Sequence, residues 1–136
     1  MQLAIIGASY LQLPLVHKAK ELGIVTHCFA WEEGAVCKDA ADFFYPISIL
    51  EKEQILAVCQ DRNIDGITTI ATDMAVPVVS FVAQQMGLTG NSTSTAENAT
   101  NKAKMRRAFD IGNVKSPRYS IADAVPAAEF KFPVIV

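Results

Sequence analysis

The chain opens with Leu3-Ala4-Ile5-Ile6-Gly7-Ala8-Ser9, a short and continuous apolar run that ends at a glycine turn. Such a run is typical of a strand buried on both faces, as in a parallel sheet. Apolar residues then recur at helical spacing over residues 11–22, with Pro14 tolerated in the first turn and Gly23 as a stop signal. This opening therefore predicts a strand, a glycine turn and a helix.

The alternation of strand-like and helix-like patterns continues along the chain. Further strands are predicted at residues 24–30, 43–45 and 67–71, and further helices at residues 48–61, 77–86 and 94–111. The first and the last of these helices would open with Ser-x-x-Glu capping boxes, at Ser48 and Ser94. Right-handed crossovers between such units give a parallel sheet with helices on both faces. We therefore predict an α/β fold, a three-layer Rossmann-like domain whose mostly parallel sheet has strand order 3-2-1-4.

Length and composition point to an ordinary globular domain. The chain has 136 residues, of which 51% are hydrophobic, and a formal net charge of −2. That length predicts one domain that buries about two thirds of its surface, and the apolar content with the low net charge excludes intrinsic disorder. The longest apolar stretch, residues 75–79, is far shorter than a membrane span, and no basic segment precedes the apolar opening as in a signal peptide. We therefore expect a cytoplasmic protein with no membrane partner.

The cysteines and histidines indicate structural roles. Cys28, Cys37 and Cys59 are odd in number and form no C-x-x-C pair. Without a secretory signal they are predicted to be buried thiols in a reducing compartment, and a zinc site is not expected. His17 and His27 have no partner at metal-ligand spacing, so both are predicted to be structural. No catalytic triad or Cys–His pair can be assigned from spacing, so no catalytic residue is named.

Charge is distributed unevenly along the chain. Residues 1–101 carry 5 basic and 11 acidic side chains, whereas residues 102–136 carry 7 basic and 3 acidic ones. The low net charge argues against a nucleic-acid partner. The basic C-terminal part indicates either an anion bound near residues 102–107 or a solvated helix face.

The loops at the carboxyl ends of the strands are the predicted ligand site, because open parallel sheets bind ligands there. Three segments should emerge at this edge, residues 7–12, 31–33 and 72–75. The first keeps the leading glycine of the dinucleotide-binding fingerprint but has Ser9 and Gln12 where the other two glycines would lie. Those glycines permit a pyrophosphate to approach the backbone closely, so a nicotinamide dinucleotide is an alternative ligand rather than the expected one.

Acidic residues lie in the other two segments. Glu32 or Glu33 follows the second strand and would bind the ribose in the dinucleotide alternative. Asp73 follows the fourth strand and precedes a helix. It is therefore expected to cap that helix, to contact the ligand, or to do both.

Several stretches resemble the amino-terminal domain of ATP-grasp enzymes. They are residues 5–14, 41–47, 70–77, 90–106 and 112–117, together with Phe132-Pro133-Val134-Ile135-Val136. Each motif is weak alone, but their order and spacing are fairly specific and cover nearly the whole chain. The chain is most similar to carbamoyl-phosphate-synthetase large-subunit-like proteins, with biotin carboxylase and the purine-synthesis carboxylases as more distant relatives.

The resemblance implies an ATP-dependent ligase. In such enzymes ATP with Mg²⁺ phosphorylates a carboxylate, and an amine or another nucleophile captures the acyl phosphate. Residues 1–112 would form the pre-ATP-grasp Rossmann-like domain, which helps to bind a small-molecule carboxylate substrate. Residues 113–136 would form the connection and the first strand leading into a grasp domain, with the chain truncated before its catalytic part and its metal-binding acids. A homodimer is compatible with this resemblance.

The same resemblance implies the site residues. Lys102 matches a basic residue that contacts an ATP phosphate, and phosphoryl transfer depends on such positioned charges. The substrate-binding residues would be Gly7, Ala8, Ser9, Tyr10, Leu11, Asp73 and Asn91. No metal ligand is assigned. Relatives often have Gly-x-Gly where Gly7-Ala8-Ser9 stands, so the ligand of this loop is left open.

Two alternative functions remain at this point. One is a nicotinamide-dinucleotide-binding Rossmann domain of an oxidoreductase, against which Ser9 and Gln12 argue. The other is a non-catalytic binding module with a flavodoxin-like sheet, against which the strand-like end of the chain and the basic helix at Lys102 argue. On the leading hypothesis the full-length protein is an enzyme, whereas this chain alone is not.

Overall fold

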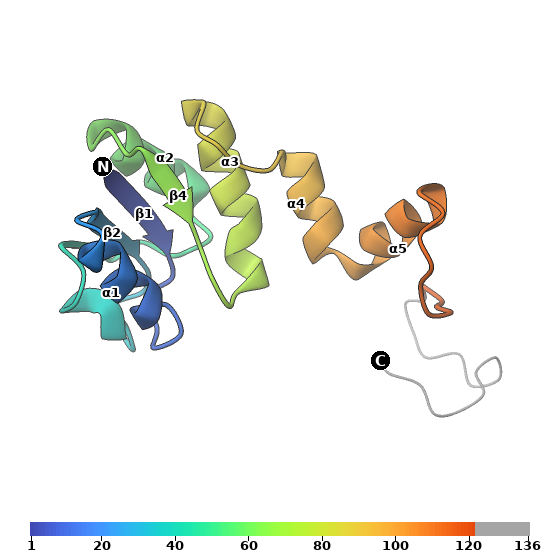
Figure 1. The fold of residues 1–136 in the computed structure, drawn as a ribbon, viewed down its shortest axis with the longest axis horizontal. Coiled ribbons are helices and arrows are strands. Elements are labelled where there is room, and N and C mark those ends of the chain that lie inside the picture. The colour runs from blue at the N-terminus through green and yellow to red at the C-terminus, as the bar shows by residue number, and fades with distance from the viewer. Residues whose placement is uncertain (122–136) are drawn as a thin grey trace.

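The structure is a computed structural model that describes residues 1–121. Within that range, four strands form one parallel sheet in the order β3-β2-β1-β4 (Figure 1). The strands are β1 (Gln2–Ile6), β2 (Val25–Phe29), β3 (Phe43–Tyr45) and β4 (Gly66–Thr68). The predicted strand order and parallel direction are confirmed.

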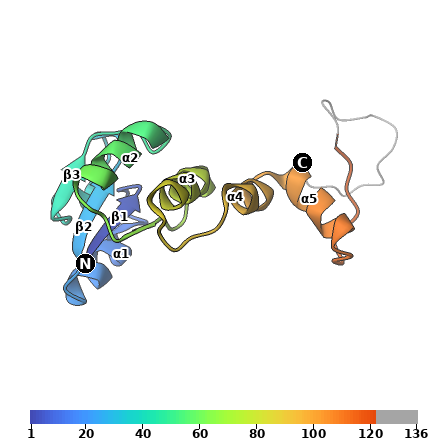
Figure 2. The same ribbon diagram turned by 90° about the horizontal axis from the view of Figure 1, so that it is seen from above.

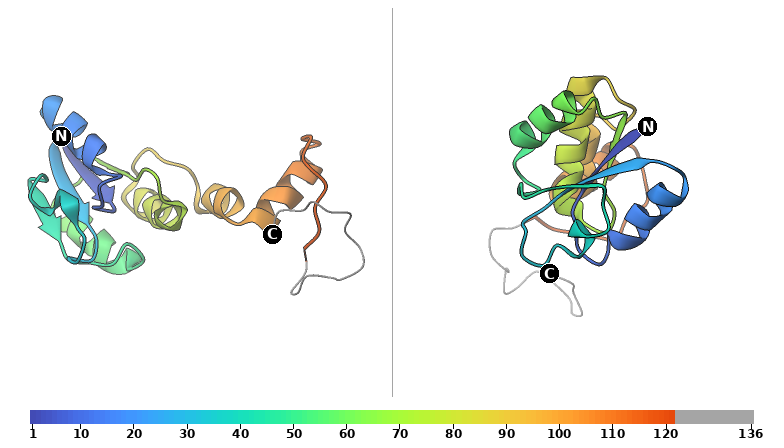
Figure 3. Two further views of the ribbon diagram at one scale, coloured as in Figure 1. Left: turned by 90° about the horizontal axis from the view of Figure 1, so that it is seen from below. Right: turned by 90° about the vertical axis from the view of Figure 1, so that its left-hand side faces the viewer.

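Helices cover both faces of the sheet, which gives the three predicted layers (Figure 3). One face carries α1 (Leu13–Glu21) and the short 3-10 helix η1 (Val36–Lys38), and the other carries α2 (Lys52–Asp61) and α3 (Val76–Met86). The central strand β1 serves both layers because successive side chains of a strand point to opposite faces. Ala4 and Ile6 belong to the core with α2 and α3, whereas Ile5 packs in the core with Val16 of α1 and Cys37 of η1.

Strand β4 ends at Thr68 rather than at the predicted residue 71. The hydroxyl of the next residue, Thr69, donates a hydrogen bond to the carbonyl oxygen of Ile6 at 2.7 Å, so a side chain takes over from the ladder at the end of β1. Ala71 then adopts a left-handed φ of 58°, which an extended strand does not accommodate. The chain therefore turns over the carboxyl edge of the sheet earlier than the apolar pattern predicted.

The helix predicted at residues 94–111 is two helices, α4 (Thr93–Thr100) and α5 (Lys102–Ile111). Asn101 separates them in an extended conformation, with φ −94° and ψ 111°, and its side-chain oxygen accepts a hydrogen bond from the backbone N–H of Lys104 at 3.0 Å. Asparagine is a strong N-cap residue, and this local bond competes with continuation of the helix. The predicted capping box at Ser94 is likewise wrong, because Ser92 caps α4 through the N–H of Thr95.

The other predicted capping box, at Ser48, is also wrong. Helix α2 begins only at Lys52, and its N-cap residue Glu51 makes no side-chain capping bond. The hydroxyl of Ser48 instead accepts a hydrogen bond from the N–H of Leu50 at 3.3 Å. A Ser-x-x-Glu pattern therefore marks a turn here, just before the helix.

Helices α4 and α5 lead away from the sheet. Figure 2 shows α3, α4 and α5 following one another outward, with α4 packed against α3 and α5 against α4. No residue of α5 is buried. Residues 113–121 contain no helix or strand, and the strand predicted at residues 133–136 lies outside the described residues.

The predictions for cysteine and histidine can be compared with the core. Cys28, Cys37 and Cys59 are free and buried, as predicted, and burial raises the pKa of the Cys28 and Cys59 thiols to about 12. His27 is fully buried and lies within hydrogen-bond distance of the Tyr45 hydroxyl (3.1 Å) through Nδ1. Burial also lowers the pKa of His27, so its imidazole is a neutral structural group. No helix within residues 1–121 has the length and apolar character that a membrane crossing requires.

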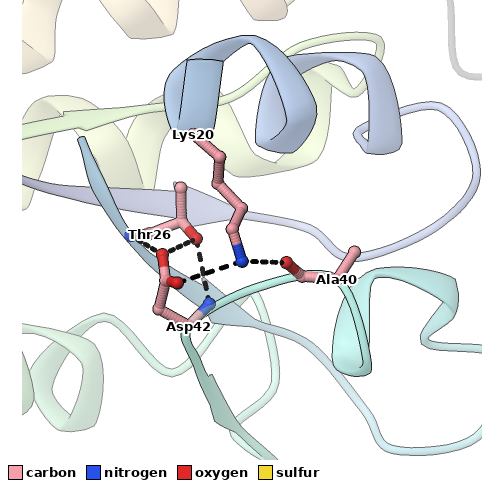
Figure 4. A network of polar contacts seen from close by, with 4 residues as sticks. All are labelled: Lys20, Thr26, Ala40 and Asp42. Carbon is pink, nitrogen blue, oxygen red and sulfur yellow. Dashed lines mark hydrogen bonds and ion pairs between the residues drawn. The ribbon is translucent and has the colours of Figure 1, made fainter. Parts of the chain in front are cut away.

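A polar network ties α1 to the amino ends of β2 and β3 (Figure 4). The carboxylate of Asp42 accepts hydrogen bonds from the backbone N–H of Thr26 (2.9 Å) and from its hydroxyl (2.8 Å). Lys20 of α1 lies 3.0 Å from the other carboxylate oxygen and also donates to the carbonyl of Ala40 at 2.9 Å. The network lies away from the carboxyl edge of the sheet, so its role is structural.

This network should make stability depend on pH in the acid range. The N–H of Thr26, followed by Lys20, lowers the pKa of Asp42 from 3.8 to about 2 in the folded protein. Because the folded pKa lies below the unfolded one, the contribution of Asp42 is complete above about pH 4 and is lost as the pH falls through about 2. Urea unfolding across this range should therefore show that the free energy of unfolding falls less steeply with decreasing pH for Asp42→Asn than for the unaltered chain. Asp39→Asn, which removes the same charge from an exposed side chain outside the network, should keep the original slope; an equal flattening would contradict this assignment.

Candidate functional site

The carboxyl edge of the sheet holds an open cavity of about 280 Å³. Four connections contribute to it: the β1–α1 loop, the segment after β2, the β3–α2 connection and the segment after β4. The lining residues are Gly7, Ala8, Ser9, Leu11, Gln12, Ala30, Trp31, Glu33, Gly34, Ala35, Ile49, Ala71 and Thr72. Each of the three segments predicted to meet at this edge contributes to the cavity, which is the usual place for a ligand in an open parallel sheet.

Gln12 organises the β1–α1 loop. Its side chain is almost completely buried, with 2% of the residue exposed. Its carboxamide oxygen accepts hydrogen bonds from the backbone N–H (3.0 Å) and the hydroxyl (2.7 Å) of Ser9, and its amide nitrogen donates to the carbonyl of Ile70 at 2.6 Å. One side chain therefore fastens the loop after β1 to the segment after β4.

Gly7 permits this arrangement. Its φ is +106°, a conformation that residues with a side chain rarely adopt. A Cβ atom at this position would come within 3.0 Å of Cδ of Gln12, so the absence of a side chain leaves the room in which the Gln12 carboxamide sits. The loop is thus built around an amide group where a dinucleotide-binding loop has glycines.

Hydrogen bonds within the protein occupy three backbone donors of this loop that a phosphate could otherwise use. The N–H of Gly7 donates to the carbonyl of Phe29 (2.9 Å), that of Ser9 to Gln12, and that of Leu11 to the hydroxyl of Ser9 (3.2 Å). Pro14, near the start of α1, has no N–H at all. Phosphate binding at a helix N-terminus relies on N–H groups that point at the ligand. The geometry therefore disfavours the nicotinamide dinucleotide alternative.

The segment after β2 contributes an aromatic ring and an acid. Trp31 lines the cavity with 71% of its surface exposed, and Glu33 is also exposed. The neighbouring Glu32 does not line the cavity and is paired with Lys38, whose hydrogen bond lowers the pKa of Glu32. Cys37 anchors this segment to the first loop, because its N–H donates to the carbonyl of Ala8 at 2.9 Å.

The predicted substrate-binding residues divide into two groups. Gly7, Ala8, Ser9 and Leu11 line the cavity, whereas Tyr10, which is 70% exposed, does not. Asp73 is not a lining residue either, although the preceding Thr72 is. Asp73 is the first residue of the 3-10 helix η2 (Asp73–Ala75), and Thr72 holds its cap position. The predicted N-cap role of Asp73 is therefore wrong.

Asn91 and Lys102 lie apart from this cavity. Helix α3 starts near the carboxyl edge and runs back along the sheet (Figure 1). Asn91 follows Gly90, which packs against Ala83 in the second half of that helix. Lys102 is the exposed first residue of α5, directly after the cap residue Asn101. Neither residue lines the cavity, and their ligand roles stay predictions.

Several contributors to the cavity were not anticipated from the sequence, among them Gln12 and Ile49. Gln12 was treated only as a missing glycine, although a long amide at a fingerprint glycine position was itself a signal. Ile49 comes from the β3–α2 connection, whose path has no sequence signature. Within residues 1–121, no group of three or more His, Cys, Asp or Glu side chains could hold a metal ion.

Comparisons with known proteins give this site its context. No protein-family model matches the sequence. An alanine–anticapsin ligase from Bacillus subtilis (strain 168) is 34% identical over 91 residues, which cover 58% of this chain and 19% of that ligase. The solved phosphoribosylglycinamide synthetase from Anaerococcus prevotii superimposes with a TM-score of 0.75 at 29% identity, over 82% of this chain and 29% of that one.

An L-amino acid ligase from Bacillus licheniformis is similar as well, with a TM-score of 0.67 and 25% identity over 85% of this chain and 31% of the ligase. The chain thus spans about a fifth of the curated relative and less than a third of each solved chain. All three are ATP-grasp enzymes, and the part that matches is their amino-terminal domain. In fold and in sequence, this chain is similar to the amino-terminal domain of ATP-grasp enzymes.

Proposed function

We propose that this chain is the substrate-binding domain of an ATP-dependent carboxylate–amine ligase. The observation that carries the proposal is the cavity at the carboxyl edge, in a domain whose relatives of 25–34% identity include two ligases. A pocket at this edge, lined mainly by apolar groups with a few polar ones, is the usual form of a small-molecule site. Two of these relatives are named as ligases, one of alanine and anticapsin and one of L-amino acids, and a cavity of this size suits small molecules of that kind.

In the proposed reaction ATP, bound with Mg²⁺, supplies the phosphoryl group that converts the carboxylate into an acyl phosphate, and an amine then displaces phosphate to form an amide. The part of this chain in that reaction is to hold a substrate at the cavity and to position Lys102 for a phosphate. We assign no Mg²⁺ ligand, since residues 1–121 contain no cluster of acidic side chains that fits the ion.

We retain residues 1–112 as the extent of the domain and residues 113–136 as the connection to a grasp domain. The expected cytoplasmic location is kept on the three free, buried thiols. A homodimer stays compatible with the proposal. The oxidoreductase alternative is set aside because the backbone N–H of Ser9, which a pyrophosphate would use as a donor, is already bonded to Gln12.

A direct test uses the natural protein that carries this chain, incubated with ATP, Mg²⁺ and mixtures of carboxylates and amines. The proposal expects continued ADP release over many turnovers that requires both a carboxylate and an amine. Continued ADP release in the absence of the carboxylate and the amine would contradict the proposal. Reduction of a nicotinamide in place of ADP release would also contradict it.

Lys102→Ala should weaken ATP binding to that protein by about tenfold or more, because a charge-assisted hydrogen bond contributes ~1.5–3 kcal/mol and each 1.4 kcal/mol is tenfold. Calorimetry of the ATP complex measures the effect. Lys18→Ala, which removes an exposed lysine paired with Glu21 on α1, is the matched control and should leave the affinity unchanged. Equal affinities for the Lys102 variant and the unaltered protein would make Lys102 an ordinary surface lysine.

The 136-residue chain alone is expected to bind ATP only weakly, with a dissociation constant of about 10 mM or more. One lysine supplies less than the ~4.1 kcal/mol that a 1 mM complex requires. Titration of this chain with Mg–ATP checks the expectation. A dissociation constant well below about 1 mM would indicate a self-contained nucleotide site and would favour the binding-module alternative.

A further inference from the structure

The cavity at the carboxyl edge has an unbalanced set of polar groups. Of the residues that line it, Glu33 alone is ionisable. Within residues 1–121 no cation pairs with Glu33, whereas the nearby Lys38 is held by Glu32. Two donors of the first loop, the N–H groups of Ser9 and Leu11, are bonded inside the protein. The cavity therefore offers a ligand one negatively charged side chain and no positively charged one.

Apart from Ser9, Gln12 and Thr72, the remaining lining residues of the cavity are apolar or glycine. Trp31, Leu11 and Ile49 contribute the large side chains, and the others are mostly small residues. Trp31 presents an exposed ring, and aromatic rings attract cations as well as apolar groups. An anionic ligand would meet the charge of Glu33 without a compensating lysine or arginine among the lining residues. A cation would meet a carboxylate and the face of a ring.

We propose that this cavity binds a small amine in its cationic form, with the ammonium group at Glu33 and an apolar body against Trp31 and Leu11. The inference rests on the proposed function in making this amine a substrate: the bound ammonium group gives up a proton to solvent, and the free amine then attacks the acyl phosphate and displaces phosphate. It assigns to the cavity the amine rather than the carboxylate that the family resemblance alone implied. Glu33 acts as a binding residue and Trp31 as a specificity-determining one.

The test needs three ligands that share one skeleton and differ in charge: 3-phenylpropylamine, 3-phenyl-1-propanol and 3-phenylpropionate. Trp31 is the one tryptophan of the 136-residue chain, so its fluorescence reports on this cavity without a label. Calorimetry run in parallel detects binding that leaves the fluorescence unchanged. The amine should bind about fivefold or more tightly than the alcohol, and the propionate more weakly than the alcohol.

Variants at Glu33 distinguish direct contact between this carboxylate and the ligand from a general effect of negative charge near the cavity. Glu33→Gln should bring the affinities of the amine and the alcohol together, and Glu33→Lys should make the propionate the preferred ligand. Glu32→Gln removes the same charge one residue away, outside the cavity, and should retain the preference for the amine. Because Glu33 is exposed, thermal unfolding of its variants should match that of the unaltered chain.

Several results would overturn this inference. They are no binding of any of the three ligands, equal or stronger binding of the propionate, or an equal loss of preference in the Glu32 and Glu33 variants. These binding results are independent of catalysis by the natural protein. A cation preference without amide formation would overturn the proposed ligase function alone, and amide formation without the preference would overturn the assignment of this cavity alone.

Discussion

Replacing Gln12 with alanine is expected to lower the free energy of unfolding by about 2–4 kcal/mol. The substitution leaves the N–H of Ser9 and the carbonyl of Ile70 without their partners in a part-buried loop, and each lost partner costs ~1–3 kcal/mol. Urea unfolding followed by circular dichroism measures the difference. The cavity should change as well, because Gln12 joins the loop after β1 to the segment after β4.

Two further variants make this prediction specific. Gln84→Ala, at an exposed glutamine of α3, should change stability by less than about 0.5 kcal/mol. Gln12→Glu keeps an oxygen for the N–H of Ser9 but places a buried carboxylate oxygen against the carbonyl of Ile70, so it should destabilise the protein by at least the cost of the second bond. A loss for Gln12→Ala no larger than that for Gln84→Ala would show that the loop does not depend on the Gln12 side chain.

The sheet could be predicted because its signals are local. The apolar run ending at Gly7 and the similar runs at residues 24–30 and 43–45 each mark a buried strand, and the handedness of crossovers then leaves few possible orders. Strand order 3-2-1-4 is one of these few orders. The carboxyl edge, and with it the meeting of three loops, follows from the topology.

The errors have a different physical origin. The split at Asn101 and the early end of β4 each coincide with a single side-chain hydrogen bond. The N–H of Lys104 donates to the side-chain oxygen of Asn101, and the hydroxyl of Thr69 donates to the carbonyl of Ile6. Bonds of this kind compete with regular structure, and residue patterns averaged over a helix or strand do not detect them. The two predicted capping boxes are wrong for the same reason. The hydroxyl of Ser48 accepts a hydrogen bond in a turn before α2, and Ser92 rather than Ser94 caps α4.

The candidate site was predictable in outline and not in detail. Segments 7–12, 31–33 and 72–75 were predicted to meet, and all three contribute to the cavity. Which side chains turn inward was not predictable. Asp73 carries a charge and Tyr10 a large ring, and both were predicted to bind the substrate. Their neighbours Thr72 and Leu11 line the cavity instead. Loop conformation decides such choices, and it depends on contacts between loops that are distant in sequence.

Gly7→Ala is expected to lower the free energy of unfolding by about 2–4 kcal/mol. A backbone with φ +106° costs ~1–3 kcal/mol when the residue has a side chain. The new methyl group would also lie 3.0 Å from Cδ and 3.2 Å from Oε1 of Gln12, so that side chain must shift. Three hydrogen bonds hold Gln12, and the shift lengthens them. Equilibrium unfolding in urea gives the measured difference.

Gly23→Ala is the matched control for the backbone part of this cost. Its φ is +70°, and a Cβ atom there would meet nothing within 4 Å, so the variant should lose only ~1–2 kcal/mol. Equal losses for the two glycine variants would mean that Gln12 yields to the methyl group at no cost.

The pair Gly7 and Gln12 can be separated by combining the two substitutions. With alanine at residue 12 the carboxamide is gone, so the methyl group of Gly7→Ala should meet no obstacle. The double variant should then be more stable than the sum of the single losses predicts, with a coupling of ~1 kcal/mol, as is usual for residues in contact. Additive losses would contradict the view that glycine is required at residue 7 because glutamine fills the loop at residue 12. A double variant that is more stable than the sum predicts would mean that Gly7 and Gln12 act together in this loop. The Gln12 carboxamide would then fill the place that a pyrophosphate takes in a dinucleotide-binding loop.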